Sequence, residues 1–148
     1  MGMTNIPYTL ENSIGYKLSI ATRLAHNRLN QYFRDGGYPV THEQWILISF
    51  LWRRDGQTQN RLARLSRKDQ PSVSRLIDNM IKRGMVVRVP HPDDRRTNLI
   101  YLTDYCRSIV DDLGDKASQT IEDVFNGFTV EERNITIKML DRIIDNLD

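Results

Sequence analysis

Cysteine, proline and glycine are scarce in this sequence, and long apolar runs are missing. A single cysteine, Cys106, among 148 residues leaves no intrachain disulfide and fits a reducing compartment. Five prolines and eight glycines argue against a collagen-like or low-complexity chain. The longest nearly apolar run, residues 45–52, is far shorter than the roughly 20 residues that cross a bilayer, and Met1 to Leu10 show no basic start followed by an apolar stretch. We expect one soluble cytoplasmic domain, residues 1–148, without membrane contact.

Catalytic and metal-binding signatures are also missing. The three histidines and Cys106 lie far apart in the sequence, and no His-Glu-x-x-His or paired Cys-x-x-Cys pattern occurs. There is no Gly-rich phosphate loop and no nucleophile elbow. Adjacent acids such as Asp111-Asp112 point apart on a helix instead of facing one scissile bond. We expect neither an enzyme nor a metal or cofactor site, and we interpret Cys106 as a small buried residue at a helix start.

Positive charge is concentrated in the middle of the chain. The whole sequence carries a net charge of +2. Residues 53–107 hold thirteen Lys and Arg against six Asp, which gives +7, whereas residues 108–148 hold four Lys and Arg against ten Asp and Glu, which gives −6. A basic block of this kind is expected of a surface that binds a polyanion. A solvated face with ordinary salt bridges is an equally open interpretation of the charge alone.

Apolar side chains recur at helical spacing on both sides of the basic block. The N-terminal stripe predicts a long helix that ends near Gly36-Gly37, and the C-terminal stripes predict two helices with a break at Gly127 and a cap at Thr129. We expect segments 8–36 and 104–148 to form a dimerisation unit, although a bundle within one chain would show the same stripes. The apolar positions are Ile14, Leu18, Ala21, Ala25, Leu29 and Tyr32, and then Val110, Leu113, Ala117, Ile121, Val124, Phe128, Ile137, Leu140, Ile144 and Leu147.

Two short helices joined by a tight turn are predicted within residues 41–103. Thr58 can cap the first, over residues 59–65, and Gln70-Pro71 begins the second, with proline in the first turn where a helix tolerates it best. Arg67 stands in the turn where glycine is usual. The pattern is that of a helix-turn-helix.

The second short helix exposes short hydrogen-bonding side chains at its N-terminal end and cations further along. A recognition helix has this order, because its first turns meet base edges while its cations meet phosphates. The exposed positions are Gln70, Ser72, Ser74, Arg75, Asn79, Lys82 and Arg83.

Two β-strands are predicted directly after Gly84, over residues 85–89 and 99–102, because both segments are rich in β-branched and aromatic residues. The connection carries Arg95 and Arg96 at its tip, which is typical of a wing whose arginines enter a narrow minor groove. Pairing of one of these arginines with a neighbouring aspartate would instead rigidify the turn.

Five segments together carry a family resemblance. They are Thr58 to Ala63, Gln70 to Met80, Arg83 to Val86, Asp94-Arg95-Arg96 and Leu102-Thr103. They resemble the MarR family of winged helix-turn-helix transcription regulators. The resemblance implies a mostly α-helical fold with a small β-wing, a homodimer formed by the first and last helices, and binding to pseudo-palindromic operators in double-stranded DNA. It also implies a cytoplasmic, nucleoid-associated repressor that a small anionic aromatic ligand or an oxidant releases.

The expected DNA contacts lie on the two short helices, the strand after them and the wing. By resemblance, Arg96 is the wing arginine and Asp94 orients it. A winged-helix module used for architecture or protein docking, without an effector, is the alternative. The expected contacts are Thr58, Gln59, Gln70, Pro71, Ser72, Ser74, Arg75, Asn79, Lys82, Arg88, Arg95 and Arg96.

A binding cleft for an anionic aromatic effector needs apolar walls and one cation. Arg23, Tyr38 and Trp45 are close enough in sequence to line one cleft between the dimerisation helices and the winged part. The simpler alternative makes Trp45 a core residue and Arg23 a solvated surface charge.

Overall fold

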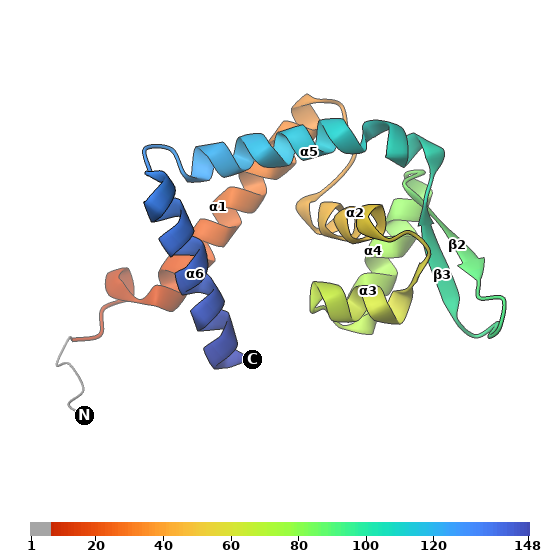
Figure 1. Cartoon of the computed structure of the whole chain (residues 1–148), viewed down its shortest axis with the longest axis horizontal. Coiled ribbons are helices and arrows are strands. Elements are labelled where there is room, and N and C mark those ends of the chain that lie inside the picture. The colour runs from red at the N-terminus through yellow and green to blue at the C-terminus, as the bar shows by residue number, and fades with distance from the viewer. Residues whose placement is uncertain (1–6) are drawn as a thin grey trace.

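The computed structural model describes residues 7–148, so most of the segment Met1 to Leu10 lies outside the described residues. Within them the fold is mostly α-helical with one small sheet, as predicted (Figure 1). In chain order the elements are η1 (Leu10–Asn12), α1 (Ile14–Asp35), α2 (His42–Arg53), β1 (Gln57–Thr58), α3 (Gln59–Ser66), α4 (Gln70–Lys82), β2 (Val86–Pro90), β3 (Asn98–Leu102), α5 (Asp104–Val124) and α6 (Val130–Leu147).

Helix α1 is only partly covered by the rest of the chain. It ends before Gly36-Gly37 as predicted, and Gly37 turns the chain with φ +80°. Leu29, near the C-terminal end of the apolar stripe, is buried, and so is Phe33, which the predicted stripe did not include. Ile14, at the other end, is 63% exposed. The N-terminal half of this stripe therefore remains open to another surface.

The core is enclosed by α2, α3, α4 and the inner face of the sheet. Thr41 begins α2 with a capping box that includes Gln44. Leu62 of α3 and Val73 and Ile77 of α4 belong to the same cluster of buried residues. The largest fully buried side chains are Phe33, Leu47, Ile48, Leu51, Leu62, Ile77, Met80, Met85, Ile100, Leu113, Val73 and Val86.

The sheet has three antiparallel strands in the order β1-β3-β2. The hairpin β2–β3 was predicted, with β2 shifted by one residue and β3 beginning one residue earlier than expected. Strand β1 was not, because its two residues, Gln57 and Thr58, are too few to show a period of two. It pairs Gln57 with Ile100 and continues directly into α3. The pairing anchors the start of the helix-turn-helix on the wing.

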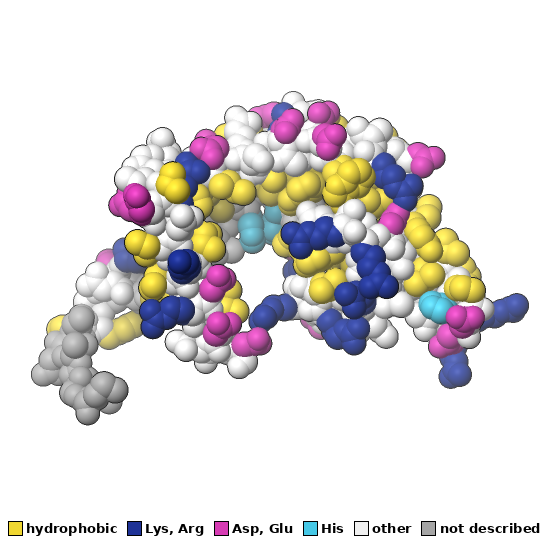
Figure 2. Space-filling model, viewed as in Figure 1, with side chains coloured by type: hydrophobic (Ala, Val, Ile, Leu, Met, Phe, Trp, Pro, Cys, Tyr) yellow, Lys and Arg dark blue, Asp and Glu magenta, His cyan; other side chains and the backbone are white. Residues whose placement is uncertain are grey.

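Helix α5 leads from the sheet to α1, against which it packs, and α6 then runs from the far end of α5 at a steep angle to it (Figure 1). The break at Gly127 and the Thr129 cap occur as predicted, with Glu132 completing a capping box. No residue of α6 is buried. An open space lies between most of α6 and the winged part (Figure 2), and the ion pair of Arg67 with Asp148 bridges it at the C-terminal end of α6. The large apolar side chains left exposed on α1, α5, α6 and the α5–α6 connection are Ile14, Tyr16, Leu24, Tyr105, Ile121, Val124, Phe128, Val130, Ile135, Ile137, Met139, Ile144 and Leu147.

Candidate nucleic-acid interface

Side-chain caps and one strained residue shape the turn between α3 and α4. The Thr58 hydroxyl accepts the Arg61 N–H at 3.1 Å, and the Asp69 carboxylate accepts the Ser72 N–H at 2.8 Å. The N–H of Ser72 and the Ser72 side chain hold the pKa of Asp69 below its usual range. Arg67 adopts a left-handed conformation with φ 55° and ψ 37°, which is the position where glycine was expected. The turn therefore forms despite its unfavourable residue.

The N-terminal half of α4 presents polar side chains on its outer face. Gln70 donates to the Asn60 side chain on α3 at 2.6 Å, and the Arg75 guanidinium donates to the Ser72 hydroxyl at 3.3 Å. Pro71 and Arg75 are exposed, whereas Ser72 and Ser74 are half-buried. Asn79 and Lys82, further along the helix, are exposed as well. The polar start and the cationic end follow the predicted order.

The wing tip holds its backbone with Asp94 and leaves its arginines in solvent. The Asp94 carboxylate accepts the Arg96 N–H at 3.0 Å and the Thr97 hydroxyl at 3.2 Å. Its distance to the Arg96 Nε is 3.8 Å, and the Arg96 side chain is 96% exposed. Arg95 is exposed too. Asp94 thus fixes the turn, and both arginines are free to reach a ligand.

Charge is divided between the two parts of the molecule. Figure 2 shows Lys and Arg side chains gathered over the winged part and at the wing tip, while Asp and Glu side chains follow the outer edge of α5. The segregation agrees with the charge of +7 over residues 53–107 and −6 over residues 108–148. A duplex would meet the positive side of the molecule.

Arg88 differs from the other expected contacts because it faces the protein. Its Nη2 donates to Asp78 of α4 at 3.0 Å and to Gln59 of α3 at 3.4 Å. Its side chain is only 29% exposed, and its buried Nε has no hydrogen-bond partner. The spacing explains this position, since Arg88 lies two residues after buried Val86 on the inner face of β2.

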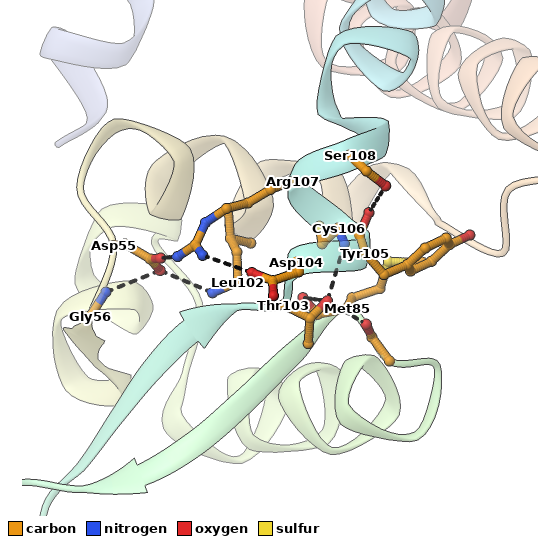
Figure 3. Close-up of polar contacts among 11 residues, drawn as sticks. Asp55, Gly56, Met85, Leu102, Thr103, Asp104, Tyr105, Cys106, Arg107 and Ser108 are labelled. Carbon is orange, nitrogen blue, oxygen red and sulfur yellow. Dashed lines mark hydrogen bonds and ion pairs between the residues drawn. The ribbon is translucent and has the colours of Figure 1, made fainter.

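A polar joint fixes the winged part to the start of α5 (Figure 3). Asp55 accepts the Gly56 and Leu102 N–H groups at 3.1 and 2.9 Å and pairs with Arg107. Thr103 caps α5 by accepting the Cys106 N–H at 3.1 Å, and its hydroxyl donates to the carbonyl of Gly84 at 2.6 Å. The first turn of α5 is thereby bonded both to the loop after α2 and to the turn after α4.

The three residues expected to line one effector cleft do not share a cavity. Arg23 lines an open surface hollow of about 530 Å³ along α1, together with His26 and with His42 at the start of α2. Tyr38 lines a different cavity and donates to Asp112 of α5 at 2.5 Å. Trp45 packs against the core cluster. The three residues are separated in this chain because Tyr38 faces α5 and Trp45 faces the core, and their part in binding an effector stays a prediction.

Sequence reasoning missed a histidine pair at the junction of α1 and α2. The rings of His26 and His42 stack with centroids 3.7 Å apart and an interplanar angle of 14°. The side-chain oxygen of Asn30 accepts the backbone N–H of His42 at 2.7 Å, and the Asn30 amide nitrogen lies 3.2 Å from the Nδ1 of the His42 ring. Burial lowers the pKa of His42, and the neighbouring His26 lowers it further. The only feature of the sequence that could have indicated this pair is that His26 lies on the same helical face as Ala25 and Leu29.

Metal sites, membrane-spanning helices and the state of Cys106 can be described for residues 7–148. There, no three His, Cys, Asp or Glu side chains come together as a possible metal site, and no helix is long and apolar enough to span a membrane. Cys106 is fully buried at the start of α5, and burial raises the pKa of its thiol to about 11. A thiol held in this protonated form is a poor nucleophile.

The helix-turn-helix, the wing and the flanking long helices define a winged helix-turn-helix protein, a class built to bind DNA. Residues 38–97 match the model of the MarR family. Over this segment, and in its fold, the chain is similar to MarR-family transcriptional regulators, which are DNA-binding proteins.

Individual relatives are distant in sequence and close in fold. The chain is 24% identical over 135 residues to the HTH-type transcriptional regulator YdgJ of Bacillus subtilis, which covers 91% of this chain and 73% of YdgJ. It superimposes with a TM-score of 0.85 on BpsR of Bordetella bronchiseptica, at 23% identity and with 95% and 99% of the two chains covered. For the transcriptional repressor CouR bound to a 23-mer DNA duplex the TM-score is 0.82, at 23% identity and with 91% and 94% covered.

Proposed function

We propose that two copies of this chain form a sequence-specific repressor that binds a pseudo-palindromic operator in double-stranded DNA. The observation that carries the proposal is the set of exposed polar and cationic side chains on α4, Arg75, Asn79 and Lys82, together with the two exposed wing arginines. Short polar groups at the start of α4 suit base edges, and cations along α4 and at the wing suit phosphates and a narrow minor groove. The DNA-bound state of CouR, a repressor of the same fold, supports the assignment.

The dimer is supported by the apolar side chains that the fold leaves exposed on α1, α5 and α6. Together with the gap beside α6 (Figure 2) they indicate a surface that a second copy covers. A two-fold symmetric pair would carry two recognition helices to successive major grooves, about 10 bp apart on one side of the duplex.

For the effector, we keep the class of ligand that the sequence suggested, a small anionic aromatic molecule, and assign it to a different set of residues. The hollow along α1 combines Arg23, Leu18 and the imidazole rings of His26 and His42. An apolar side chain, aromatic rings and one cation suit a small anionic aromatic molecule. The hollow lies where the dimerisation helices meet the winged part, so a bound ligand could change the spacing of the recognition helices. BpsR, whose DNA binding is regulated by 6-hydroxynicotinic acid, supports this class of ligand.

The test begins with operators selected from a random duplex library, followed by binding measurements over a range of salt. We expect the logarithm of affinity to fall linearly with the logarithm of salt concentration, and selected half-sites to lie about 10 bp apart. Binding that is insensitive to salt, or equally tight binding of one half-site by a monomer, would contradict the proposal.

The effector arm uses salicylate as the probe, with tryptophan fluorescence and operator affinity measured in parallel. We expect salicylate to weaken operator binding, and Arg23→Gln to reduce that effect without changing operator affinity in its absence. If salicylate quenched tryptophan fluorescence without weakening operator binding, it would bind the protein without regulating DNA binding.

A further inference from the structure

Asp78 occupies an unexpected place for an acidic residue. It lies on the outer face of α4, three residues after Arg75 and four before Lys82, and its side chain is 54% exposed. A carboxylate at that position faces the same side as the groups expected to approach a polyanion, and it would oppose binding unless it were neutralised.

Arg88 supplies the neutralising charge from the wing strand. Its Nη2 reaches Asp78 at 3.0 Å and Gln59 at 3.4 Å, so one guanidinium joins α4, the first residue of α3 and β2. Three elements that the duplex would contact are thereby held by one side chain. We call Arg88, Asp78 and Gln59 the wing brace.

The burial of the brace argues against a direct phosphate contact by Arg88. Arg95 and Arg96 point into solvent, whereas Arg88 lies on the inner face of β2 with its Nε buried and unpartnered. An arginine that leaves a buried donor unpaired costs stability. The hydrogen bonds of its Nη2 with Asp78 and Gln59 offset that cost.

We propose that Arg88 is a positioning residue for DNA recognition, which with Asp78 and Gln59 sets the angle between the recognition helix and the wing. The inference rests on the proposed function. A fixed angle lets α4 enter the major groove while the wing arginines reach the adjacent minor groove, so the brace contributes to discrimination between operator and other DNA.

The experiment measures affinity for the selected operator and for a scrambled duplex of the same length. Asp78→Asn removes a negative charge from the DNA side, so simple electrostatics predicts tighter binding to both duplexes. The brace predicts the opposite for the operator: about tenfold weaker binding, with scrambled DNA unchanged or slightly tighter. Arg88→Gln should lose a similar factor, and the double variant should be no weaker than Arg88→Gln alone, because the two side chains act as one unit.

Two further variants separate positioning from charge. Lys82→Gln, on the exposed face of α4, should weaken binding to both duplexes to the same extent, as loss of a phosphate contact does. Arg88→Lys keeps the charge but lacks the fork that reaches two acceptors, so we expect it to lose operator discrimination as Arg88→Gln does. Thermal melting of every variant verifies that it folds, and Arg88→Lys is the decisive variant if Arg88→Gln does not.

Tighter binding by Asp78→Asn, additive losses in the double variant, or Arg88→Lys with unchanged discrimination would each overturn the inference and make Arg88 an ordinary phosphate contact. These results would leave the proposed function intact, since the wild-type protein would still select an operator. Failure of the wild type to select any operator would instead reject the proposed function itself.

Discussion

Arg75 and Arg96 represent the two kinds of contact that we expect single residues to make with DNA. Arg75 is on the outer face of α4 beside Ser72, and Arg96 extends from a turn that Asp94 fixes. We expect Arg75→Ala to relax base preference at one operator position, by about 1–3 kcal/mol for a bidentate contact. Arg96→Ala should weaken binding more evenly across sequences and lower the salt slope by about 1. Operator selection with each variant measures both effects, and an unchanged preference in Arg75→Ala would remove it from direct readout.

His42 makes the junction of α1 and α2 sensitive to acid. Its Nδ1 lies against the amide nitrogen of Asn30 and its ring under His26, so a proton on Nδ1 would break a hydrogen bond and bring a charge beside a second imidazole. Glu43 opposes these effects and Lys68 adds to them, but burial dominates and the pKa of His42 is lowered. Folding therefore favours the neutral ring.

The sign of the resulting pH dependence follows from linkage. A lowered pKa contributes stability that is fully present above the pKa of the unfolded chain, about 6.5, and is lost as the pH falls through the lower folded value. We expect the free energy of unfolding in urea to decrease from pH 8 to about pH 5, and His42→Gln to reduce that decrease. His91→Gln, a change in the wing far from the junction, is the control and should keep the wild-type dependence.

At the scale of elements, the turn of the helix-turn-helix tests the cost of a left-handed arginine. Arg67 has φ 55°, and its pairing with Asp148 at 3.2 Å is exposed on both sides, so the ion pair contributes little. We expect Arg67→Gly to be more stable than Arg67→Ala by about 1 kcal/mol, since both remove the side chain and only glycine removes the strain. Equal melting temperatures for the two variants would show that the strain is absent.

The joint between the sheet and α5 provides a second test at this scale. Asp55 accepts two backbone N–H groups and pairs with Arg107, whereas Asp104 is fully exposed and 3.5 Å from the same guanidinium. We expect Asp55→Asn to lower stability by about 1–2 kcal/mol in urea unfolding. Asp104→Asn, the matched control, should change it by less than about 0.5 kcal/mol. A similar loss in both would mean that the charge of Asp55 is not used in the joint.

At the scale of the whole molecule, the exposed apolar side chains of α6 predict an obligate assembly. Ile144 is 46% exposed on the predicted stripe, and a charge there would be costly to bury at an interface. We expect sedimentation to report a dimer at micromolar concentration for the wild type and for Asn146→Asp, and a monomer or aggregate for Ile144→Asp. Deleting residues 129–148 should leave aggregated or unfolded protein, and a well-folded monomer from that deletion would contradict the assembly.

The sequence by itself determined most of the elements and the class of protein. Caps at Thr58 and Thr129, the breaks at Gly36-Gly37 and Gly127, and the stripes of apolar residues act over a few neighbouring positions, so they can be read in order along the chain. The two-arginine wing and the polar start of α4 are equally local. These features were sufficient to predict the helix-turn-helix, the hairpin and the flanking helices.

Only the tertiary structure decided which distant side chains meet. Arg88 pairs with Asp78 across two elements, Asp55 bonds to Leu102 and Arg107, and His26 stacks on His42, while Tyr38 and Trp45 turn away from Arg23. Such contacts depend on the crossing angles of helices and on which face of a strand is buried. Packing of the complete core sets both, and no run of neighbouring residues encodes them.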